Sequence, residues 1–175
     1  MLTGCGLSGD PGLTLRQQLQ TDLCSFQAEI TADYGDSLYE FTLDCQGDDQ
    51  GNVSFLVSSP ESIQGITGTI RGGKGALTFE DTALSFPLLA DGQLSPVSAP
   101  WLLLRVLRGG NLLSQGKDGS FTRLTIRDGY QDGDLLSDVW LDEDGTPTRA
   151  EFLHKGRKIL SIKLSSFRTG LENAA

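Results

Sequence analysis

The stretch of sequence that decides the fold is Ser98 to Gly110, which reads SAPWLLLRVLRGG. Ser98 can cap a helix, Pro100 fits its first turn, and the two glycines can end it. Between these signals only Arg105 and Arg108 are polar, so the predicted helix is apolar around nearly its whole circumference. A helix on a protein surface has a single apolar stripe. We therefore expect this helix to lie inside the concave face of a strongly curved antiparallel sheet, with its two arginines directed to water.

Most of the remaining chain is predicted to form strands. Segments such as 52–58 and 121–127 alternate apolar and polar residues, and turn pairs such as Asp128-Gly129 and Asp144-Gly145 separate them. A period of two gives each strand one buried and one wet face, which is typical of an antiparallel sheet. The pattern predicts about nine or ten strands and one further short helix at 14–23. The 22 glycines fit the bends and bulges of strongly curved strands.

Composition argues against several classes of function. The chain has 175 residues and a formal charge of −9 with 14 Lys and Arg, which is too few for the basic stripe of a nucleic-acid binder. One His and three Cys are too few for a zinc or iron–sulfur site, so we expect no metal and no cofactor. The sequence has no apolar run long enough to span a bilayer.

The N-terminus resembles the end of a bacterial lipoprotein signal. Leu2-Thr3-Gly4-Cys5 is an apolar residue and two small ones before a cysteine, which predicts lipidation of Cys5. Only Met1 precedes Leu2, so a complete signal peptide requires an apolar stretch upstream; alternatively, Cys5 is incidental. We expect a flexible tether at 1–12, one domain at 13–168 and a tail at 169–175. This interpretation places the protein outside the cytoplasm, held on the membrane through a lipid anchor only.

Cys24 and Cys45 fall in a predicted hairpin. Strands at 24–33 and 36–45 are joined by Tyr34-Gly35, and pairing Asp33 with Asp36 places the two cysteines directly opposite each other. They then form a non-hydrogen-bonded pair, in which the Cα atoms are about 4.5 Å apart, at the short end of the range for a disulfide. We favour a bridge, which implies an oxidising compartment. The alternative is two free thiols in the core.

A series of apolar and turn motifs follows the N-terminal pattern, namely Phe26-x-Ala28-x-Ile30, Tyr39-x-Phe41-x-Leu43, Phe55-x-Val57-x-x-Pro60-Glu61, Gly65-Ile66-Thr67, Ser95-Pro96 before the apolar helix, Gly145-x-Pro147 and Phe167. This order resembles the LolA/LolB lipoprotein-carrier superfamily over residues 20–168. Within it, the chain is similar to the GerS-type lipoproteins of Gram-positive spore formers. The resemblance implies a mainly β (α+β) fold, an unclosed β-barrel of roughly eleven strands with helices as a lid over an apolar cavity.

Two functions follow from this resemblance. In the first, the protein is a non-enzymatic binding protein that holds an apolar ligand, an acyl chain or a lipoprotein, in its concave cavity. In the second, the cavity is filled, and the outer surface or a sheet edge binds a cell-envelope protein; by analogy with the GerS type, this is a peptidoglycan amidase acting in sporulation. The alternative for each cavity residue is that it simply fills the core. The predicted lining residues are Phe41, Phe55, Phe86, Trp101, Leu104, Val106 and Trp140.

Catalysis is not predicted. His154 is the only histidine and lies in phase with Ala150 and Phe152 on a predicted strand, which indicates a core or sheet-edge position. The acidic clusters at 132–134 and 142–144 fall in turns, and neither has the bidentate Glu of a calcium loop at the expected spacing. The glycine-rich segment 71–75 lacks the spacing of a phosphate loop and predicts a hairpin turn.

Overall fold

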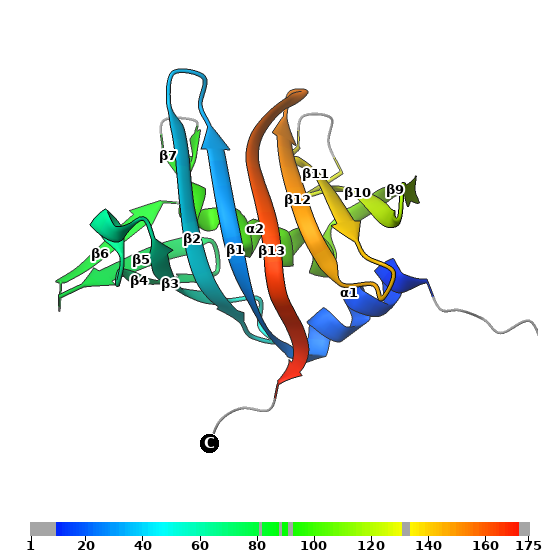
Figure 1. The fold of residues 1–175 in the computed structure, drawn as a ribbon, viewed down its shortest axis with the longest axis horizontal. Coiled ribbons are helices and arrows are strands. Elements are labelled where there is room, and N and C mark those ends of the chain that lie inside the picture. The colour runs from blue at the N-terminus through cyan, green and yellow to red at the C-terminus, as the bar shows by residue number, and fades with distance from the viewer. Residues whose placement is uncertain (1–9, 81, 88, 91–92, 131–133, 172–175) are drawn as a thin grey trace, which may run out of the picture.

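The computed structural model describes residues 10–80, 82–87, 89–90, 93–130 and 134–171 (Figure 1). Eleven strands form one antiparallel sheet, in the order β6-β5-β4-β3-β2-β1-β13-β12-β11-β10-β9, and β7 and β8 form a separate pair. The two outer strands, β6 and β9, do not pair with each other, so the sheet is not closed. The helices and strands are α1 (Pro11–Thr21), β1 (Leu23–Asp33), β2 (Leu38–Gly47), β3 (Val53–Ser59), β4 (Thr67–Arg71), β5 (Lys74–Phe79), β6 (Thr82–Pro87), β7 (Leu89–Ala90), β8 (Gln93–Leu94), α2 (Ala99–Gly109), β9 (Asn111–Asp118), β10 (Phe121–Arg127), β11 (Leu136–Leu141), β12 (Pro147–His154) and β13 (Arg157–Leu171), with short 3-10 turns at Glu61–Ile63 and Pro96–Ser98.

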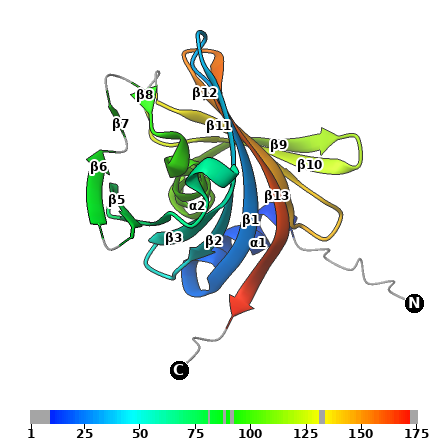
Figure 2. The same cartoon turned by 60° about the vertical axis from the view of Figure 1, so that its left-hand side comes forward.

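Helix α2 lies in the concave face of this sheet, which wraps around it (Figure 2). Eight of its residues are buried, from Ala99 to Leu104 together with Val106 and Leu107, and Arg105 is exposed. All of them except Pro100 belong to one core cluster with the inward-facing residues of the strands. The sequence prediction of a curved, open sheet around an apolar helix is therefore confirmed. A helix without a broad polar face cannot pack one side on a flat sheet and leave the other side in water.

Helix α1 packs against the C-terminal end of α2. Asp10 caps α1 by accepting hydrogen bonds from the backbone of Gly12 at 2.9 Å and Leu13 at 3.2 Å, and so the helix begins at Pro11. Its Arg16 donates to the carbonyl oxygen of Gly110 at 2.7 Å, just beyond α2. The carbonyl groups at the end of a helix have no partner within the helix, so Arg16 satisfies one of the groups there.

The hairpin of β1 and β2 differs from the predicted one. Residues 34–37 form a four-residue loop, in which Tyr34 N donates to Ser37 O at 3.0 Å, and Asp33 pairs with Leu38. The register is displaced by two residues, so Cys24 lies opposite Gly47 and Cys45 lies opposite Phe26. The predicted disulfide is absent: both cysteines are buried free thiols, and they give no evidence of an oxidising compartment.

One strand and two element boundaries also differ from the predictions. Strand β9 was missed, because nearly all of its residues are exposed and it has no alternating apolar pattern. Helix α1 begins at Pro11 rather than at residue 14, and β13 continues to Leu171.

Candidate functional site

The described lining residues predicted on α2 and β3 are packed into the core. Trp101 is 8 % exposed, Leu104 1 % and Val106 0 %, and together with Phe55 they belong to the core cluster. Phe41 is partly buried and packs against this cluster. These side chains thus occupy the space between α2 and the sheet. Phe86 lies in β6 opposite Gly75, but its side chain falls outside the described part of the chain.

Trp140 lies on the other side of the sheet. It is opposite Arg123 and Arg149 in the ladders of β11 and does not belong to the core cluster around α2. The Arg149 guanidinium lies 4.0 Å from the ring centroid, and Trp140 Nε1 donates to Asp118 Oδ2 at 2.6 Å. The prediction that Trp140 lines the concave cavity is therefore wrong. The ring is buried by polar side chains on the outer face.

Exposed apolar groups lie at two separate margins of the concave face, at the β1–β2 hairpin and on the edge strand β6. Tyr39 follows the same alternation as Phe41 and is 52 % exposed, and its ring lies 6.0 Å from that of Tyr34. Leu84 of β6 pairs with Leu77, which packs against the core, and is 64 % exposed. We call Tyr34, Tyr39, Phe41 and Leu84 the concave rim.

The turn between β2 and β3 is fixed to α2 by charge and hydrogen bonds. Burial raises the pKa of Asp48, but hydrogen bonds from Asn52 and Gln50, with the nearby Arg108 guanidinium, lower it more, so the net shift of the pKa is downward. Arg108 donates to the carbonyl oxygens of Asp48, at 2.6 Å, and Asp49. Arg105 pairs with Asp128 at 2.7 Å. The two polar residues of α2 thus hold loops on either side of it.

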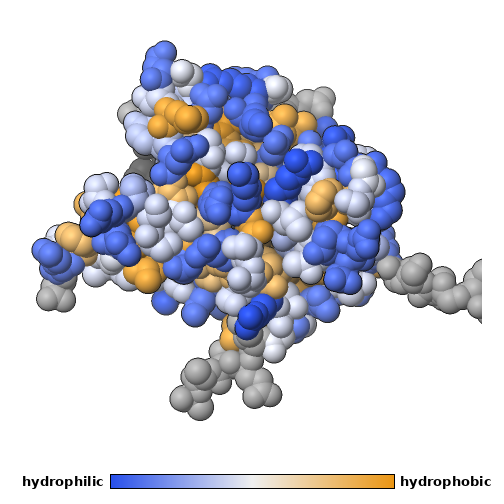
Figure 3. Space-filling model, in the orientation of Figure 1, coloured by the Kyte–Doolittle hydropathy of each residue, from blue (hydrophilic) through white to orange (hydrophobic). Residues whose placement is uncertain are grey.

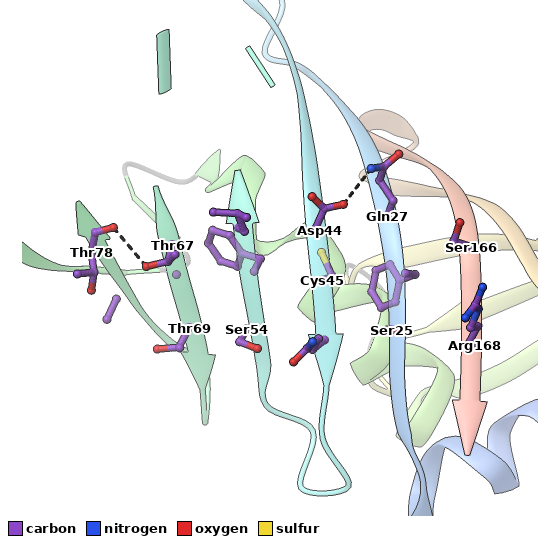
Figure 4. A pocket seen from close by; sticks show the side chains of 16 residues that line it. Ser25, Gln27, Asp44, Cys45, Ser54, Thr67, Thr69, Thr78, Ser166 and Arg168 are labelled. Carbon is purple, nitrogen blue, oxygen red and sulfur yellow. Dashed lines mark hydrogen bonds between the residues drawn. The ribbon is translucent and has the colours of Figure 1, made fainter. Parts of the chain in front are cut away.

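An open groove lies on the outer face, the side of the sheet turned away from α2. Its volume is about 640 Å³, and it crosses β5, β4, β3, β2, β1 and β13 (Figure 4). The outer face as a whole presents mostly hydrophilic and intermediate residues with scattered apolar ones (Figure 3). We call this feature the outer groove. The ladders place a first row of its side chains side by side, namely Ser25, Gln46, Ser54, Thr69 and Ala76.

A second row runs beside the first. Gln27 Nε2 donates to Asp44 Oδ1 at 2.9 Å, and Thr67 Oγ1 donates to the carbonyl oxygen of Thr78 at 3.4 Å. Leu56 stands between these pairs and is 42 % exposed. The ladders order this row as Gln27, Asp44, Leu56, Thr67 and Thr78.

A bulge in β13 closes one end of the outer groove. Gln27 pairs with Ser165 and Ser25 pairs with Arg168, so Ser166 and Phe167 both lie opposite Phe26. Ser166 has a φ of 54°, a left-handed conformation that is uncommon for a residue other than glycine. Phe167 turns inward and stacks on Phe26 at 5.4 Å between ring centroids. The bulge thus leaves Ser166 and Arg168 on the wall of the groove.

Other residues singled out from the sequence lie in turns or outside the described chain. His154 is exposed at the end of the β12–β13 hairpin, and not in the core. Asp142 Oδ1 accepts from the backbone of Asp144 at 3.0 Å and Thr146 at 2.9 Å, which is the role of a turn residue. Gly72 and Gly73 form the predicted β4–β5 turn, both with positive φ. Cys5 lies outside the described residues.

Neither a metal site nor a membrane-spanning helix is found in the described part of the chain. Among residues 10–80, 82–87, 89–90, 93–130 and 134–171, no group of three or more His, Cys, Asp or Glu side chains is placed to hold a metal ion. No helix of the same residues is both long enough and apolar enough to cross a bilayer.

The outer groove was not predicted from the sequence. Its residues come from six strands, and each contributes only one or two outward positions. The polar outward positions of the individual strands are visible in the sequence, but they read as an ordinary wet face. Only the ladders place them in two rows.

Comparisons with known proteins find similarity to solved structures. No family model and no curated protein matches the chain. An uncharacterized conserved protein from Thermus thermophilus has a TM-score of 0.49 and 14 % identity, with coverage of 90 % of this chain and 84 % of that one. A LolA superfamily protein from Nitrosomonas europaea has a TM-score of 0.48 and 11 % identity, with 91 % and 94 % coverage. A chain from the complex of the Clostridioides difficile CwlD amidase with the GerS lipoprotein has a TM-score of 0.45 and 14 % identity, with 96 % and 99 % coverage. These low identities do not single out the GerS branch.

Proposed function

We propose that this chain is a non-enzymatic cell-envelope interaction protein that binds a partner protein at a free edge of its sheet. The observation that supports this proposal is the burial of the described lining residues on α2. Trp101, Leu104 and Val106 are at most 8 % exposed and pack into the core cluster, so they have little surface to offer a ligand. We therefore expect a partner protein to be recognised at the outer surface or at a sheet edge.

Strand β9 is a free edge of the sheet that can accept a partner. It ends the strand order of the main sheet, and no strand pairs with its other side in the part of the chain that the structure describes. Leu112 is 39 % exposed and Leu113 42 %. Leu113 lies at a bulge, because Ile126 pairs with Leu112 and Thr125 pairs with Ser114. An unpaired edge offers backbone donors and acceptors to another chain, and exposed apolar residues increase its tendency to pair. An extended segment of a partner protein fits this edge.

Photo-crosslinking in the native envelope tests this proposal. A photoreactive phenylalanine analogue at Leu113 is expected to give a discrete protein adduct, and Leu112→Lys is expected to reduce it, because an edge lysine opposes strand addition. The same analogue at the exposed turn residue Asp144 is the matched control. The proposal is wrong if position 113 gives no protein adduct, or if Asp144 gives the same one.

A second candidate function is binding of an acyl chain or lipoprotein at the concave face. The concave rim supports it, since Tyr39 and Leu84 are more than half exposed on the side of α2. Each buried methylene of a chain would contribute about 0.8 kcal/mol. The analogue at Tyr39 is expected to capture a lipid under this function and none under the first. Native mass spectrometry of the purified protein gives an independent reading of bound lipid.

We propose an extracytoplasmic location for either function, with Cys5 as the site of a lipid anchor. The supporting observation is the Leu2-Thr3-Gly4-Cys5 pattern. Metabolic labelling with a palmitate analogue in the native host is expected to mark the protein and to be lost in Cys5→Ala. Absence of label in the wild-type protein, or label that persists in the variant, would contradict the anchor.

A further inference from the structure

We propose that the outer groove is a binding site for a short neutral oligosaccharide. The groove combines an elongated open shape with two parallel rows of small hydrogen-bonding side chains. It lies over β13 and β1 to β5, whereas the edge assigned to a partner protein is β9, at the far end of the strand order. Each of the two proposals can therefore be tested independently of the other.

The dimensions of the groove suit a chain of linked rings. Neighbouring strands lie about 4.8 Å apart, so the six strands from β5 to β13 span about 24 Å. The volume of about 640 Å³ is spread along this path, and the groove is open to solvent. A linear molecule can therefore lie across the strands.

The backbone hydrogen-bonding groups of these strands already have partners in the sheet. Strands β1 to β4 each pair on both sides, so their amide and carbonyl groups are engaged in the ladders. A peptide added as a further strand needs a free edge, and this groove lies on a face. Its ligand must therefore be recognised by side chains.

The side chains offer hydroxyl and amide groups with little net charge. Ser, Thr and Gln each both donate and accept hydrogen bonds, which matches the hydroxyl groups of a sugar. Asp44 and Arg168 are the only charged side chains among the described lining residues, and their charges cancel. One arginine is too little for a phosphate chain or a nucleic acid. An acyl chain would leave the hydroxyl and amide groups without partners.

Asp44 and Leu56 complete the match to a sugar. The amide of Gln27 holds one carboxylate oxygen of Asp44 at 2.9 Å, so the pair presents fixed donors and acceptors to neighbouring hydroxyls of a ring. Leu56 is opposite Asp44 in the ladder and 42 % exposed. Its apolar surface can contact the C–H face of the same ring. Figure 4 shows Gln27 and Asp44 on adjacent strands, joined by this hydrogen bond.

Titration of the whole 175-residue chain tests the site. Amide shifts are followed by NMR while cellotetraose, maltotetraose or chitotetraose is added. At least one of these neutral tetrasaccharides is expected to shift the amides of β1 to β5 and the bulge of β13, and to leave β9 unaffected. A sulfated tetrasaccharide of similar length is expected to bind at least tenfold more weakly than that neutral ligand, because the chain has a net charge of −9.

Matched variants locate the binding. Asp44→Ala and Gln27→Ala are each expected to weaken the affinity at least tenfold. Glu29→Ala removes a carboxylate from the same face of β1, outside the groove, and is expected to change the affinity less than twofold. Thermal melting checks that each variant folds; if Asp44→Ala does not fold, Gln27→Ala carries the comparison.

Any of the following results would overturn the proposal. The first is no shift with any neutral tetrasaccharide at about 10 mM, a tenfold molar excess, at which a site with a Kd of about 1 mM would be about nine-tenths occupied. The second is a shift pattern outside the groove. The third is an equal loss of affinity in Glu29→Ala, or tighter binding of the sulfated ligand. Failure here leaves the photo-crosslinking result at Leu113 unaffected, because that experiment probes a different strand.

Discussion

Leu104 of α2 packs directly on the backbone of Gly47 in β2. A Cβ atom at position 47 would lie 2.3 Å from Leu104 Cδ1 and 2.8 Å from Cys24 Sγ, closer than packed atoms approach. The absence of a side chain at Gly47 thus sets how near α2 comes to the centre of the sheet. This contact lets α2 pack closely against the concave face of β2.

Gly47→Ala is expected to destabilise the protein by about 1–3 kcal/mol, because inserting a methyl group into a packed core forces its neighbours to move. Urea denaturation measures the change in the free energy of unfolding. Gly116→Ala in β9 is the control, since nothing lies within 4 Å of a Cβ there. An unchanged midpoint for Gly47→Ala would show that Leu104 does not pack on β2 in this way.

Leu104→Ala is expected to cost about 2–5 kcal/mol, since it removes a buried side chain and leaves a cavity. The cavity would be apolar and able to take up a small molecule such as benzene, which raises the melting temperature of the variant but not that of the wild-type protein. Leu113→Ala on exposed β9 is the control and is expected to cost far less. A rise in the wild-type melting temperature would indicate that the concave face already has an open cavity.

Asp118→Ala is expected to destabilise the protein by about 1–3 kcal/mol, because it leaves the buried Trp140 Nε1 without its acceptor. In a Trp101→Phe background, Trp140 is the only tryptophan, and its emission is expected to move to longer wavelength. Asp128→Ala, which breaks the exposed pair with Arg105, is expected to cost less than about 1 kcal/mol. Equal effects of the two substitutions would contradict this account of Trp140.

The buried cysteines are expected to lower stability at high pH. Burial raises the pKa of Cys24 from 9.0 to about 11, and it also raises the pKa of Cys45. Above pH 9 the unfolded chain loses these protons while the folded chain keeps them, so the free energy of unfolding falls as the pH rises from 9 to 11. Urea denaturation at pH 8 and pH 10 is expected to show a smaller fall for the Cys24→Ala/Cys45→Ala variant.

Thiol titration gives a second reading of the same pair. In a Cys5→Ala background, both remaining thiols are expected to be unreactive in the folded protein and to react fully in denaturant without a reducing agent. A denatured protein that shows no free thiol would mean that Cys24 and Cys45 are bridged.

The hairpin of β1 and β2 shows how far a pattern can predict a register. The alternation correctly predicts that Phe26, Ala28 and Ile30 face the core. A displacement by two residues keeps every side chain on the same face, so the pattern cannot distinguish the predicted register from the observed one. The four-residue turn decides between them, and it moves Cys45 from opposite Cys24 to opposite Phe26.

Trp140 shows where the pattern itself is ambiguous. Val139, Trp140 and Leu141 are consecutive and all buried, so both faces of β11 carry an apolar residue. Alternation therefore cannot say which residue turns inward. Trp140 is buried on the outer face because Asp118 and Arg149, from other strands, cover it.

The sequence by itself determined the enclosed helix and the curved, open sheet. A helix with apolar residues on all sides, as in Trp101 to Leu107, gains free energy only when it is surrounded, and the alternating strands supply one apolar face to surround it. The tertiary structure alone decided the register of the cysteines, the side on which Trp140 lies and the two rows of the outer groove. Each of these depends on which residues stand side by side on different strands, and turn lengths and bulges fix those pairings without leaving a trace in the apolar pattern.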